Sequence, residues 1–268
     1  MSSPPVLILR APGTNCDEET ARAWELAGAA VEVHHVNRLL ESPRLLDRFR
    51  VVTIPGGFSY GDDLGAGTIL AARLTHALGD ALTRFVEQGG LILGICNGFQ
   101  VLVRTGLLPG PSTGVSATLT HNDVGHYVTR WVRLAVGPRP DSPWLTHLQD
   151  TILEIPSAHG EGKLVTTDPE GPQRLDQQRL VAFRYVDAQG QPTVAFPDNP
   201  NGSPCGIAGL IDPSGRVLGL MPHPERFILP YHHPLWTRRD PAGDHFPTPD
   251  GLRFFQAAIQ AITSSPTT

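Results

Sequence analysis

The segment Gly94-Ile95-Cys96-Asn97-Gly98 has the residue types of a nucleophile held in a sharp turn. It ends an apolar run and directly precedes a helical pattern, and in this context a G-x-nucleophile-x-G turn presents its central side chain at a strand end. Only glycine tolerates the crowding on both sides of such a turn. The N-terminus of the following helix favours the thiolate form of Cys96. A random cysteine is more often a small buried hydrophobe, but the flanking glycines favour the nucleophile here.

A thiolate that attacks an amide also needs a base and a proton donor for the leaving nitrogen. The best candidate among 11 histidines is His223, which lies in the segment MPHPER (221–226) with a proline on each side. In this extended segment His223 and Glu225 point the same way, so the carboxylate can orient the imidazole as the third member of a triad. The alternative is a surface turn with a chance histidine, and without Cys96 that interpretation would be preferred.

A third feature is the turn Pro55-Gly56-Gly57-Phe58, which ends the apolar run 51–54. If strands 51–54 and 91–95 are neighbours in a parallel sheet, this turn emerges at the same edge as Cys96. The amides of Gly57 and Asn97 can then hold an oxyanion together. The alternative is a simple strand-end turn. The glycines fit neither G-x-G-x-x-G nor a P-loop, so we expect no nucleotide site of those kinds.

The elements that must position these residues alternate between short apolar runs and helical patterns. The runs lie at 6–9, 31–36, 51–54 and 91–95, and the helical patterns at 17–29, 39–49 and 68–88. This alternation predicts an α/β fold with a mostly parallel central sheet and helices on its faces. Further strand-like runs follow at 131–136, 151–155, 180–186, 207–211 and 217–221, before a closing amphipathic helix at 251–262. We expect a single domain over residues 1–268, with 228–250 as a Pro- and His-rich loop insertion.

Composition excludes several other classes of protein. The chain has 268 residues and a formal net charge of -5, so no global basic field attracts nucleic acid. No apolar stretch is long enough for a membrane span or a secretory signal. Three cysteines without a C-x-x-C pair favour a reducing cytoplasm. We expect no metal site, because the histidine pairs 34–35 and 232–233 lack partners at ligand spacing, and Cys16 and Cys205 are interpreted as incidental.

Seven stretches along nearly the whole chain match one family in its order. They are GTNCD (13–17), GGFSYGD (56–62), GICNGFQ (94–100), GLLPG (106–110), AHGEG (158–162), NPNGS (199–203) and MPHPER (221–226). With them the chain resembles the glutaminase subunit of phosphoribosylformylglycinamidine synthase, a class I, triad-type glutamine amidotransferase. The G-x-C-x-G-x-Q core is common to the whole class. Asn97, the GGFSYGD loop and NPNGS are typical of this subfamily.

The resemblance implies a flavodoxin-like three-layer sandwich and hydrolysis of glutamine to glutamate and ammonia. The family's triad falls on Cys96 as nucleophile, His223 as base and acid, and Glu225 as the orienting carboxylate. Its substrate-binding positions fall on Gly57 and Asn97 at the oxyanion and on Gln100 against glutamine. The implied partner is a large synthetase subunit, with a small third subunit. That partner uses ATP and magnesium to convert formylglycinamide ribonucleotide to formylglycinamidine ribonucleotide in de novo purine biosynthesis, while this chain itself needs no cofactor.

The chain departs from the family's pattern in one loop. The usual GDYLRAG is replaced by GDDLGAG at 61–67, so that Asp63 and Gly65 stand in place of an aromatic residue and an arginine. Two rival functions therefore stay open. One is a thiol amidotransferase or hydrolase of the same fold that serves another acceptor, and the other is a non-catalytic regulatory subunit.

Overall fold

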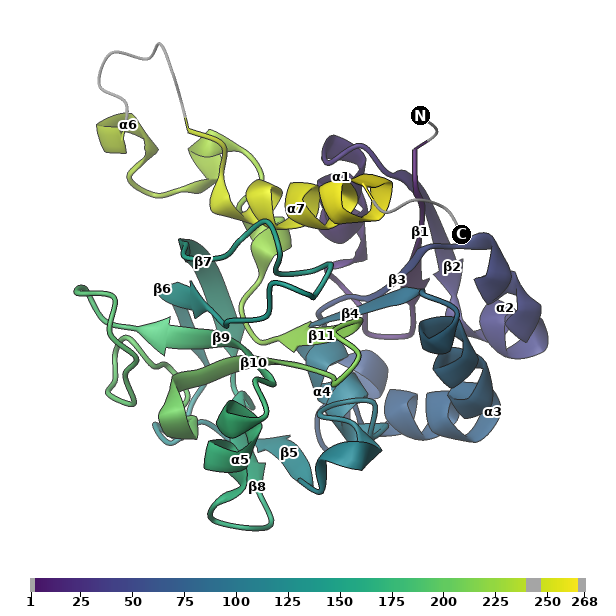
Figure 1. Ribbon diagram of the computed structural model, residues 1–268, viewed down its shortest axis with the longest axis horizontal. Coiled ribbons are helices and arrows are strands. Elements are labelled where there is room, and N and C mark those ends of the chain that lie inside the picture. The colour runs from purple at the N-terminus through teal and green to yellow at the C-terminus, as the bar shows by residue number, and fades with distance from the viewer. Residues whose placement is uncertain (1–2, 240–246, 265–268) are drawn as a thin grey trace.

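The computed structural model describes residues 3–239 and 247–264, and a nine-stranded sheet crosses the molecule (Figure 1). The strand order is β2-β1-β3-β4-β11-β10-β9-β6-β7. The bounds are β1 (Pro5–Arg10), β2 (Ala30–His35), β3 (Val51–Ile54), β4 (Leu91–Ile95), β6 (Val128–Val136), β7 (Ile152–His159), β9 (Val181–Val186), β10 (Ile207–Ile211) and β11 (Val217–Leu220). Among the described residues a separate pair, β5 (Ala117–Thr120) and β8 (Lys163–Thr166), forms a small second sheet.

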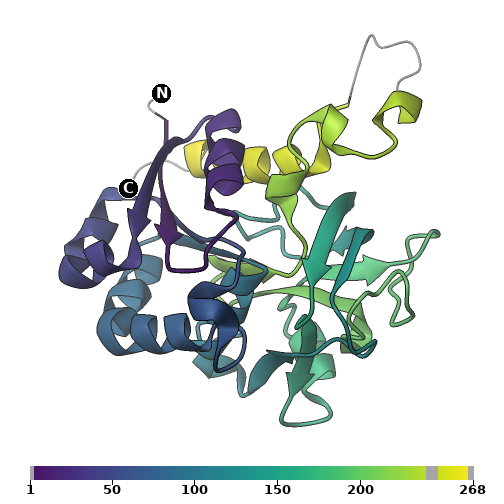
Figure 2. The same cartoon turned by 180° about the vertical axis from the view of Figure 1, so that it is seen from behind.

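The first five strands in this order are parallel to one another. Every residue of β3 and β4 is buried, as expected for central parallel strands covered on both faces. The covering helices are α1 (Asp17–Leu26), α2 (Val36–Glu41), α3 (Thr68–Glu87), α4 (Asn97–Arg104) and α7 (Asp250–Ser264). Helices α1 and α7 pack together on one side of the sheet, and α3 and α4 on the other (Figures 1 and 2). The predicted α/β class with a parallel sheet is confirmed.

The remaining strands extend the sheet in antiparallel fashion, from β11 through β10, β9 and β6 to β7. Strand β7 is an edge strand and runs to His159, four residues beyond its predicted end at 155. Pro156 suits this position, because an edge strand need not donate a hydrogen bond at every residue. Its carbonyl oxygen instead accepts a bond from the backbone N–H of His223 at 2.8 Å. The antiparallel block thus touches the loop that carries the candidate base.

Several predicted elements differ from the structure. The helix expected over 39–49 is wrong: α2 ends at Glu41 and a 3₁₀ turn, Pro43–Arg48, follows. Pro43 lacks an N–H and disfavours helical geometry at Ser42, which explains the break. The sequence patterns also missed β5, β8 and the helix α5 (Gly171–Gln177).

The segment expected as a loop insertion, 228–250, is only partly described. It contains a 3₁₀ turn, Pro230–His232, and a short helix, α6 (Trp236–Arg239), while residues 240–246 lie outside the described part of the chain. The insertion and the single-domain organisation over 1–268 both stay predictions. Among the helices that the structure describes, none combines the length and the apolar character required to span a bilayer.

An aromatic cluster fastens α1 and α7 to the sheet. The rings of Trp24 and Phe255 meet edge to face with centroids 5.0 Å apart, and Trp144 stacks on Phe254. The indole N–H of Trp24 donates to the hydroxyl of Thr53 in β3 at 3.0 Å, so the buried ring also has its polar partner. The cluster stabilises the β3 strand whose end carries the Gly56-Gly57 turn.

Three neighbouring parallel strands, β3, β4 and β11, end at the same edge of the sheet. Ile54 of β3 pairs with Gly94 of β4, so the two strands are adjacent, as the oxyanion prediction required. The loops that leave these three strands carry Gly57, Cys96 and His223. The sheet therefore delivers all three residues to one place.

Candidate active site

Cys96 occupies a strained turn between β4 and α4. Its backbone lies at φ 51° and ψ −105°, outside the regions that most non-glycine residues adopt. A side chain on Gly98 would overlap the carbonyl oxygen of Ile54, and one on Gly94 would come within 2.5 Å of the carbonyl oxygen of Gly98. Close packing therefore requires glycine at both flanking positions. Cys96 lies at the strand end and is 7% exposed. This is the geometry predicted for a nucleophile turn.

His223 and Glu225 form a buried pair directly after β11. Nδ1 of the imidazole donates to Oε1 of the carboxylate at 2.6 Å, and the two residues are only 1% and 0% exposed. His223 itself is non-helical (φ −109°, ψ 88°), but Pro224–Arg226 forms a 3₁₀ turn, so the predicted extended segment is wrong from Pro224 onward. The turn still brings the two side chains together. A buried carboxylate on Nδ1 fixes the tautomer and leaves Nε2 as the working nitrogen.

The electrostatic surroundings of His223 favour its protonated form. Burial alone would lower its pKa, but the carboxylate of Glu225 and the nearby thiol of Cys96 outweigh burial and hold the pKa well above its usual value. Within the described residues Nε2 makes no hydrogen bond of good geometry. The imidazolium is therefore available to donate a proton inside the pocket.

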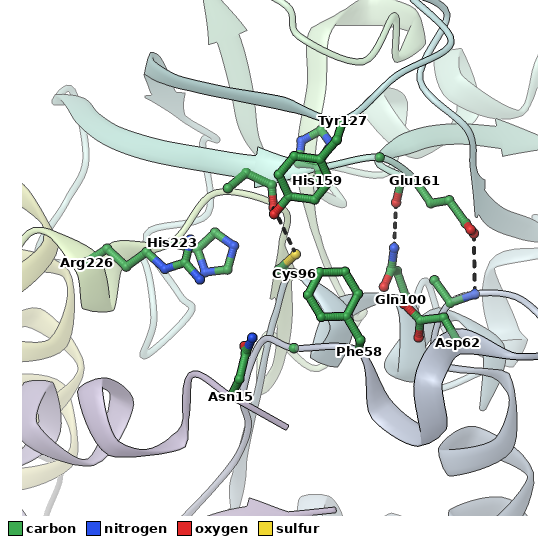
Figure 3. A pocket seen from close by; sticks show the side chains of 14 residues that line it. Asn15, Phe58, Asp62, Cys96, Gln100, Tyr127, His159, Glu161, His223 and Arg226 are labelled. Carbon is green, nitrogen blue, oxygen red and sulfur yellow. Dashed lines mark hydrogen bonds between the residues drawn. The ribbon is translucent and has the colours of Figure 1, made fainter. Parts of the chain in front are cut away.

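The Gly56-Gly57 turn reaches the pocket because residue 57 has no side chain. Gly57 lies at φ 147°, and a Cβ there would come within 2.7 Å of the carbonyl oxygen of Gly13. The N–H of Phe58 donates to that same oxygen at 2.9 Å, which fixes the turn. Gly57 and Cys96 line the same cavity of about 120 Å³. Figure 3 shows Cys96 in this cavity between His223 and Gln100. The structure thus places the candidate oxyanion donor beside the candidate nucleophile.

Asn97 and Gln100 tie the surrounding loops to α4. The side-chain oxygen of Asn97 accepts from the N–H of Ser59 at 3.1 Å, and its amide nitrogen donates to Asp62 at 3.1 Å and to Gln100 at 3.0 Å. Gln100 in turn donates to the carbonyl oxygen of Glu161 at 2.5 Å and lines the cavity. The side chain of Asn97 is therefore structural, and only its backbone amide, at the first residue of α4, is left for an oxyanion.

The loop 158–162 (AHGEG), whose chemistry could not be predicted from spacing, forms one wall of the cavity. Ala158, His159, Gly160 and Glu161 all line it. Asn201 and Ser203 of the NPNGS segment buttress this wall: Asn201 donates to the carbonyl oxygen of Gly162 at 2.9 Å, and the hydroxyl of Ser203 accepts from the N–H of Leu164 at 3.0 Å. The NPNGS segment thus contributes to the pocket by holding the loop 158–162 in place.

Cys16 was interpreted as incidental, and the structure corrects this. Its buried thiol lies beside His223, since both side chains crowd the position where Gly56 would carry a Cβ. Nη2 of Arg226 donates to the sulfur at 3.0 Å. Among the described residues, Cys16, His223 and Glu225 are the one group that could hold a metal ion, with ligand atoms within 4.8 Å of one another. The guanidinium already supplies positive charge there, and the expected absence of a metal stays a prediction.

The loop 61–67, whose sequence differs from the family pattern, is held in place by an arginine of α4. The side chain of Arg104 in α4 packs over Gly65 and donates from Nε to the carbonyl oxygen of Ala66 at 2.8 Å. Asp63, which stands where the family has an aromatic residue, is exposed and lies outside the cavity lining. The altered loop still delivers Asp62 and Ala66 to the pocket.

Comparison with known proteins places this pocket in a family. A family model described as a CobB/CobQ-like glutamine amidotransferase domain matches residues 3–260. A protein of Dehalococcoides mccartyi named phosphoribosylformylglycinamidine synthase subunit PurQ is 46% identical over 261 residues, which cover 97% of this chain and 98% of that protein. Human phosphoribosylformylglycinamidine synthase is 37% identical over 269 residues, which cover 94% of this chain and 20% of the human protein.

A solved structure agrees with these sequence relatives. A chain in the structure of PurLQS from Thermotoga maritima superposes with a TM-score of 0.71 at 30% identity, covering 97% of this chain and 99% of that one. The likeness extends over essentially the full length of both chains. The fold, including its antiparallel half, is therefore that of this relative.

Proposed function

The chain belongs to the family of CobB/CobQ-like glutamine amidotransferase domains, and we propose that its pocket hydrolyses glutamine through Cys96, His223 and Glu225. The chain is a glutamine amidotransferase, the glutaminase subunit of a phosphoribosylformylglycinamidine synthase in purine biosynthesis. The observation that carries the chemical assignment is a strained thiol in the same cavity as a buried imidazole–carboxylate pair.

The first half of the reaction forms a thioester. The thiolate of Cys96 attacks the side-chain carbonyl carbon of glutamine, and the carbonyl electron pair moves to its oxygen. The backbone amides of Gly57 and Asn97 stabilise that oxyanion. As the intermediate collapses, the C–N bond breaks and the leaving nitrogen takes a proton from imidazolium Nε2 of His223, so that ammonia departs and a glutamyl thioester remains.

The second half regenerates the thiolate. Neutral His223 takes a proton from water, and the resulting hydroxide adds to the thioester carbon. The C–S bond then breaks, glutamate leaves, and His223 is again protonated. Glu225 stabilises the imidazolium on Nδ1 throughout and does not itself take the proton.

The use of the ammonia follows from the relatives. We propose that it passes to a large synthetase subunit, which consumes ATP and magnesium to convert formylglycinamide ribonucleotide to formylglycinamidine ribonucleotide. The names of the relatives, and the PurLQS assembly that contains one of them, support this partner. We further propose that a small third subunit completes the complex, that this chain binds no cofactor, and that it works in the cytoplasm, where its three unpaired cysteines would stay reduced.

The test is glutamate release from glutamine by the purified chain, alone and with the synthetase subunits, acceptor and ATP. We expect activity that rises steeply in the complex and is coupled to amidine formation. In the Cys96→Ala control the rate falls by about 10⁶-fold, as for removal of other catalytic nucleophiles.

Three outcomes would contradict parts of the proposal. Activity that the purine synthetase does not stimulate would indicate another acceptor. If neither the isolated chain nor the complex released glutamate, although the chain still bound the synthetase, a regulatory subunit would be indicated. Turnover that survives in the Cys96→Ala control would refute the nucleophile.

A further inference from the structure

The short strand β5 leaves one of its two edges unpaired. Among the described residues β5 pairs with β8 alone, and the two strands form a small sheet at the lower margin of Figure 1. The mechanism above uses no residue of β5. An unpaired strand edge offers backbone donors and acceptors to another chain.

The backbone hydrogen bonds identify the groups at this free edge. The N–H of Thr167 donates to the carbonyl oxygen of Ser116 at 3.1 Å, across the β5–β8 pair. Because bonded and non-bonded pairs alternate in an antiparallel ladder, residues 118 and 120 also point their N–H and C=O groups toward β8. The same groups of Ala117 and Leu119 therefore point the other way, toward the unpaired side.

The opposite strand supports this assignment independently. Leu164 of β8 lies opposite Leu119, and its N–H donates away from β5, to the hydroxyl of Ser203, at 3.0 Å. The outer edge of β8 is thus covered by the chain itself. Within the part of the chain that the structure describes, the outward groups of Ala117 and Leu119 make no such bond.

An open groove lies beside β5. Its volume is about 720 Å³, and it is lined by residues 116–118 of β5, the first half of α3 and the C-terminal end of α4. Exposed lining residues next to the strand are small: Ala72 and Thr75 lie on α3, and Gly106 follows α4. An extended main chain can therefore reach the edge of β5 without meeting a bulky side chain.

The charge of the groove favours an acidic partner. Its ionisable lining residues are His76 and Arg104, both exposed, and none of the described residues that line it is acidic. The chain as a whole, in contrast, has a formal net charge of -5. Nε of Arg104 donates to a neutral group, the carbonyl oxygen of Ala66, so the guanidinium can still bind a carboxylate of an incoming segment. A second copy of this chain fits less well, because a two-fold contact would bring the two Arg104 side chains to the same surface.

We propose that an extended, acidic segment of the synthetase subunit pairs with the outer edge of β5 in this groove. This inference rests on the proposed function, which supplies that partner. The segment adds a third strand to the β5–β8 pair, with its backbone bonded to Ala117 and Leu119 and a carboxylate on Arg104. Docking there also reaches the catalytic pocket, because Ala66, which Arg104 holds, lines that pocket. The segment thus restrains the loop 61–67 when the complex forms.

The first test removes one backbone donor from the free edge. Ala117→Pro deletes an N–H that points away from β8, so the β5–β8 pairing is kept. The dissociation constant of the full chain for the purified synthetase subunit should rise about 5-fold, the effect of one hydrogen bond. The matched control, Ala117→Ser, keeps the N–H and should bind as the wild type does.

The second test changes the charge of the groove without touching β5. Ala72→Glu should raise the same dissociation constant about 10-fold at low ionic strength, because the new carboxylate repels an acidic segment. Ala72→Lys adds a side chain of similar length with the opposite charge, and it should bind at least as tightly as the wild type. Added salt should bring the two variants closer together.

Amide hydrogen exchange of the wild-type chain locates the contact. The amides of Ala117 and Leu119 should become protected when the synthetase is added. Those of Thr118 and Thr120, which already bond to β8, should exchange slowly in both states.

The outcomes separate this inference from the function on which it rests. Unchanged affinity in both Ala117→Pro and Ala72→Glu, or no new protection at Ala117 and Leu119, would overturn the strand pairing and leave the glutaminase function in place. An equal loss of affinity in Ala72→Glu and Ala72→Lys would overturn the acidic segment. Protection that instead grows with the concentration of the isolated chain would assign the groove to a second copy. A wild-type chain that does not bind the synthetase would refute the proposed partner itself.

Discussion

The two ends of the pocket are built in different ways. At one end, His223, Glu225 and Arg226 lie within four residues and are held by two prolines after one strand. At the other end, Asp62, Gln100 and Glu161 come from three loops and helices far apart in the chain and are joined by hydrogen bonds. The chemical end depends on local backbone geometry, while the recognition end depends on packing across the whole fold. Substitutions should therefore affect turnover at the first end and substrate affinity at the second.

Two buried histidines sharpen this contrast. His159 and His223 line one cavity, yet burial and mutual repulsion lower the pKa of His159 to about 3, while Glu225 and Cys96 hold that of His223 well above its usual value. The two pKa values differ because His223 has the carboxylate of Glu225 beside its ring, whereas His159 has the amide of Asn122. One imidazole is a proton carrier and the other a permanent acceptor.

The largest effect should follow from removing the proton carrier. His223→Asn should lower kcat by about 10⁶-fold with little change in KM, as loss of a catalytic base does elsewhere. Steady-state glutamate release in the complex measures both constants. A KM increase with kcat preserved would mean that His223 belongs to recognition and that the division between the two ends is wrong.

A smaller but still large effect is expected for Glu225→Gln. Turnover should fall by about 10⁴-fold, because the imidazolium loses its stabilising charge and its fixed tautomer. The pKa of His223 should also fall, so the alkaline limb of the kcat profile should move to lower pH than in the wild-type protein. An unchanged limb would show that Glu225 acts only in packing.

Loss of Asn201, which supports the loop 158–162 at the pocket wall, should act mainly on the affinity for glutamine. Asn201→Ala removes the donor to the hydroxyl of Tyr185 and leaves the carbonyl oxygen of Gly162 only a long bond, 3.4 Å, from the hydroxyl of Ser203. An unsatisfied buried group costs about 1–3 kcal/mol, so the free energy of unfolding should fall by that amount and KM for glutamine should rise several-fold. Denaturant titration and kinetics measure the two, with the exposed Asn37→Ala as control. A decrease in kcat larger than the increase in KM would mean that the loop 158–162 takes part in catalysis.

The last effect concerns how the free energy of unfolding depends on pH. The folded pKa of His159, about 3, lies below its unfolded value of about 6.5, so the unfolded chain binds a proton that the folded chain does not. Stability from this residue is lost as pH falls through that window, by about 1.4 kcal/mol per pH unit. The raised pKa of His223 has the opposite consequence: its contribution is present below pH about 6.5 and is lost as pH rises through the folded pKa.

The His159→Gln variant isolates the first of these slopes. Urea unfolding between about pH 6 and 4 should show a flatter dependence in this variant than in the wild-type protein. The control is His126→Gln, because His126 is exposed, and its slope should match that of the wild type. Equal slopes for all three proteins would mean that His159 is not held neutral.

The chemical end could be predicted because each of its signals is local. The glycines around Cys96 and the prolines around His223 restrict their own backbones, and the strands that carry them are continuous apolar runs. The recognition end could not be predicted in the same way. Glu161 acquires its place from hydrogen bonds to Gln100 and Ala66, and no spacing in the sequence indicates those contacts.

The same distinction explains the errors. Cys16 lies in a polar stretch and lacks flanking constraints, and only the fold brings its thiol to Arg226, 210 residues away. The helix expected over 39–49 follows a helical pattern of apolar residues, but Pro43 breaks it, a signal that was present in the sequence. The short strands β5 and β8 pair with each other across a wide sequence separation, so neither has a strong pattern of its own.

The assignment of Cys96 as the nucleophile is tested most directly by detecting the covalent intermediate. The complex would be mixed with isotopically labelled glutamine, quenched in acid and digested. The mass of each of the three cysteine-containing peptides would then be measured by mass spectrometry. One glutamyl group should be found on the peptide that contains Cys96, and none in the Cys96→Ser protein. A label on Cys16 or Cys205, or turnover with no labelled cysteine, would contradict it.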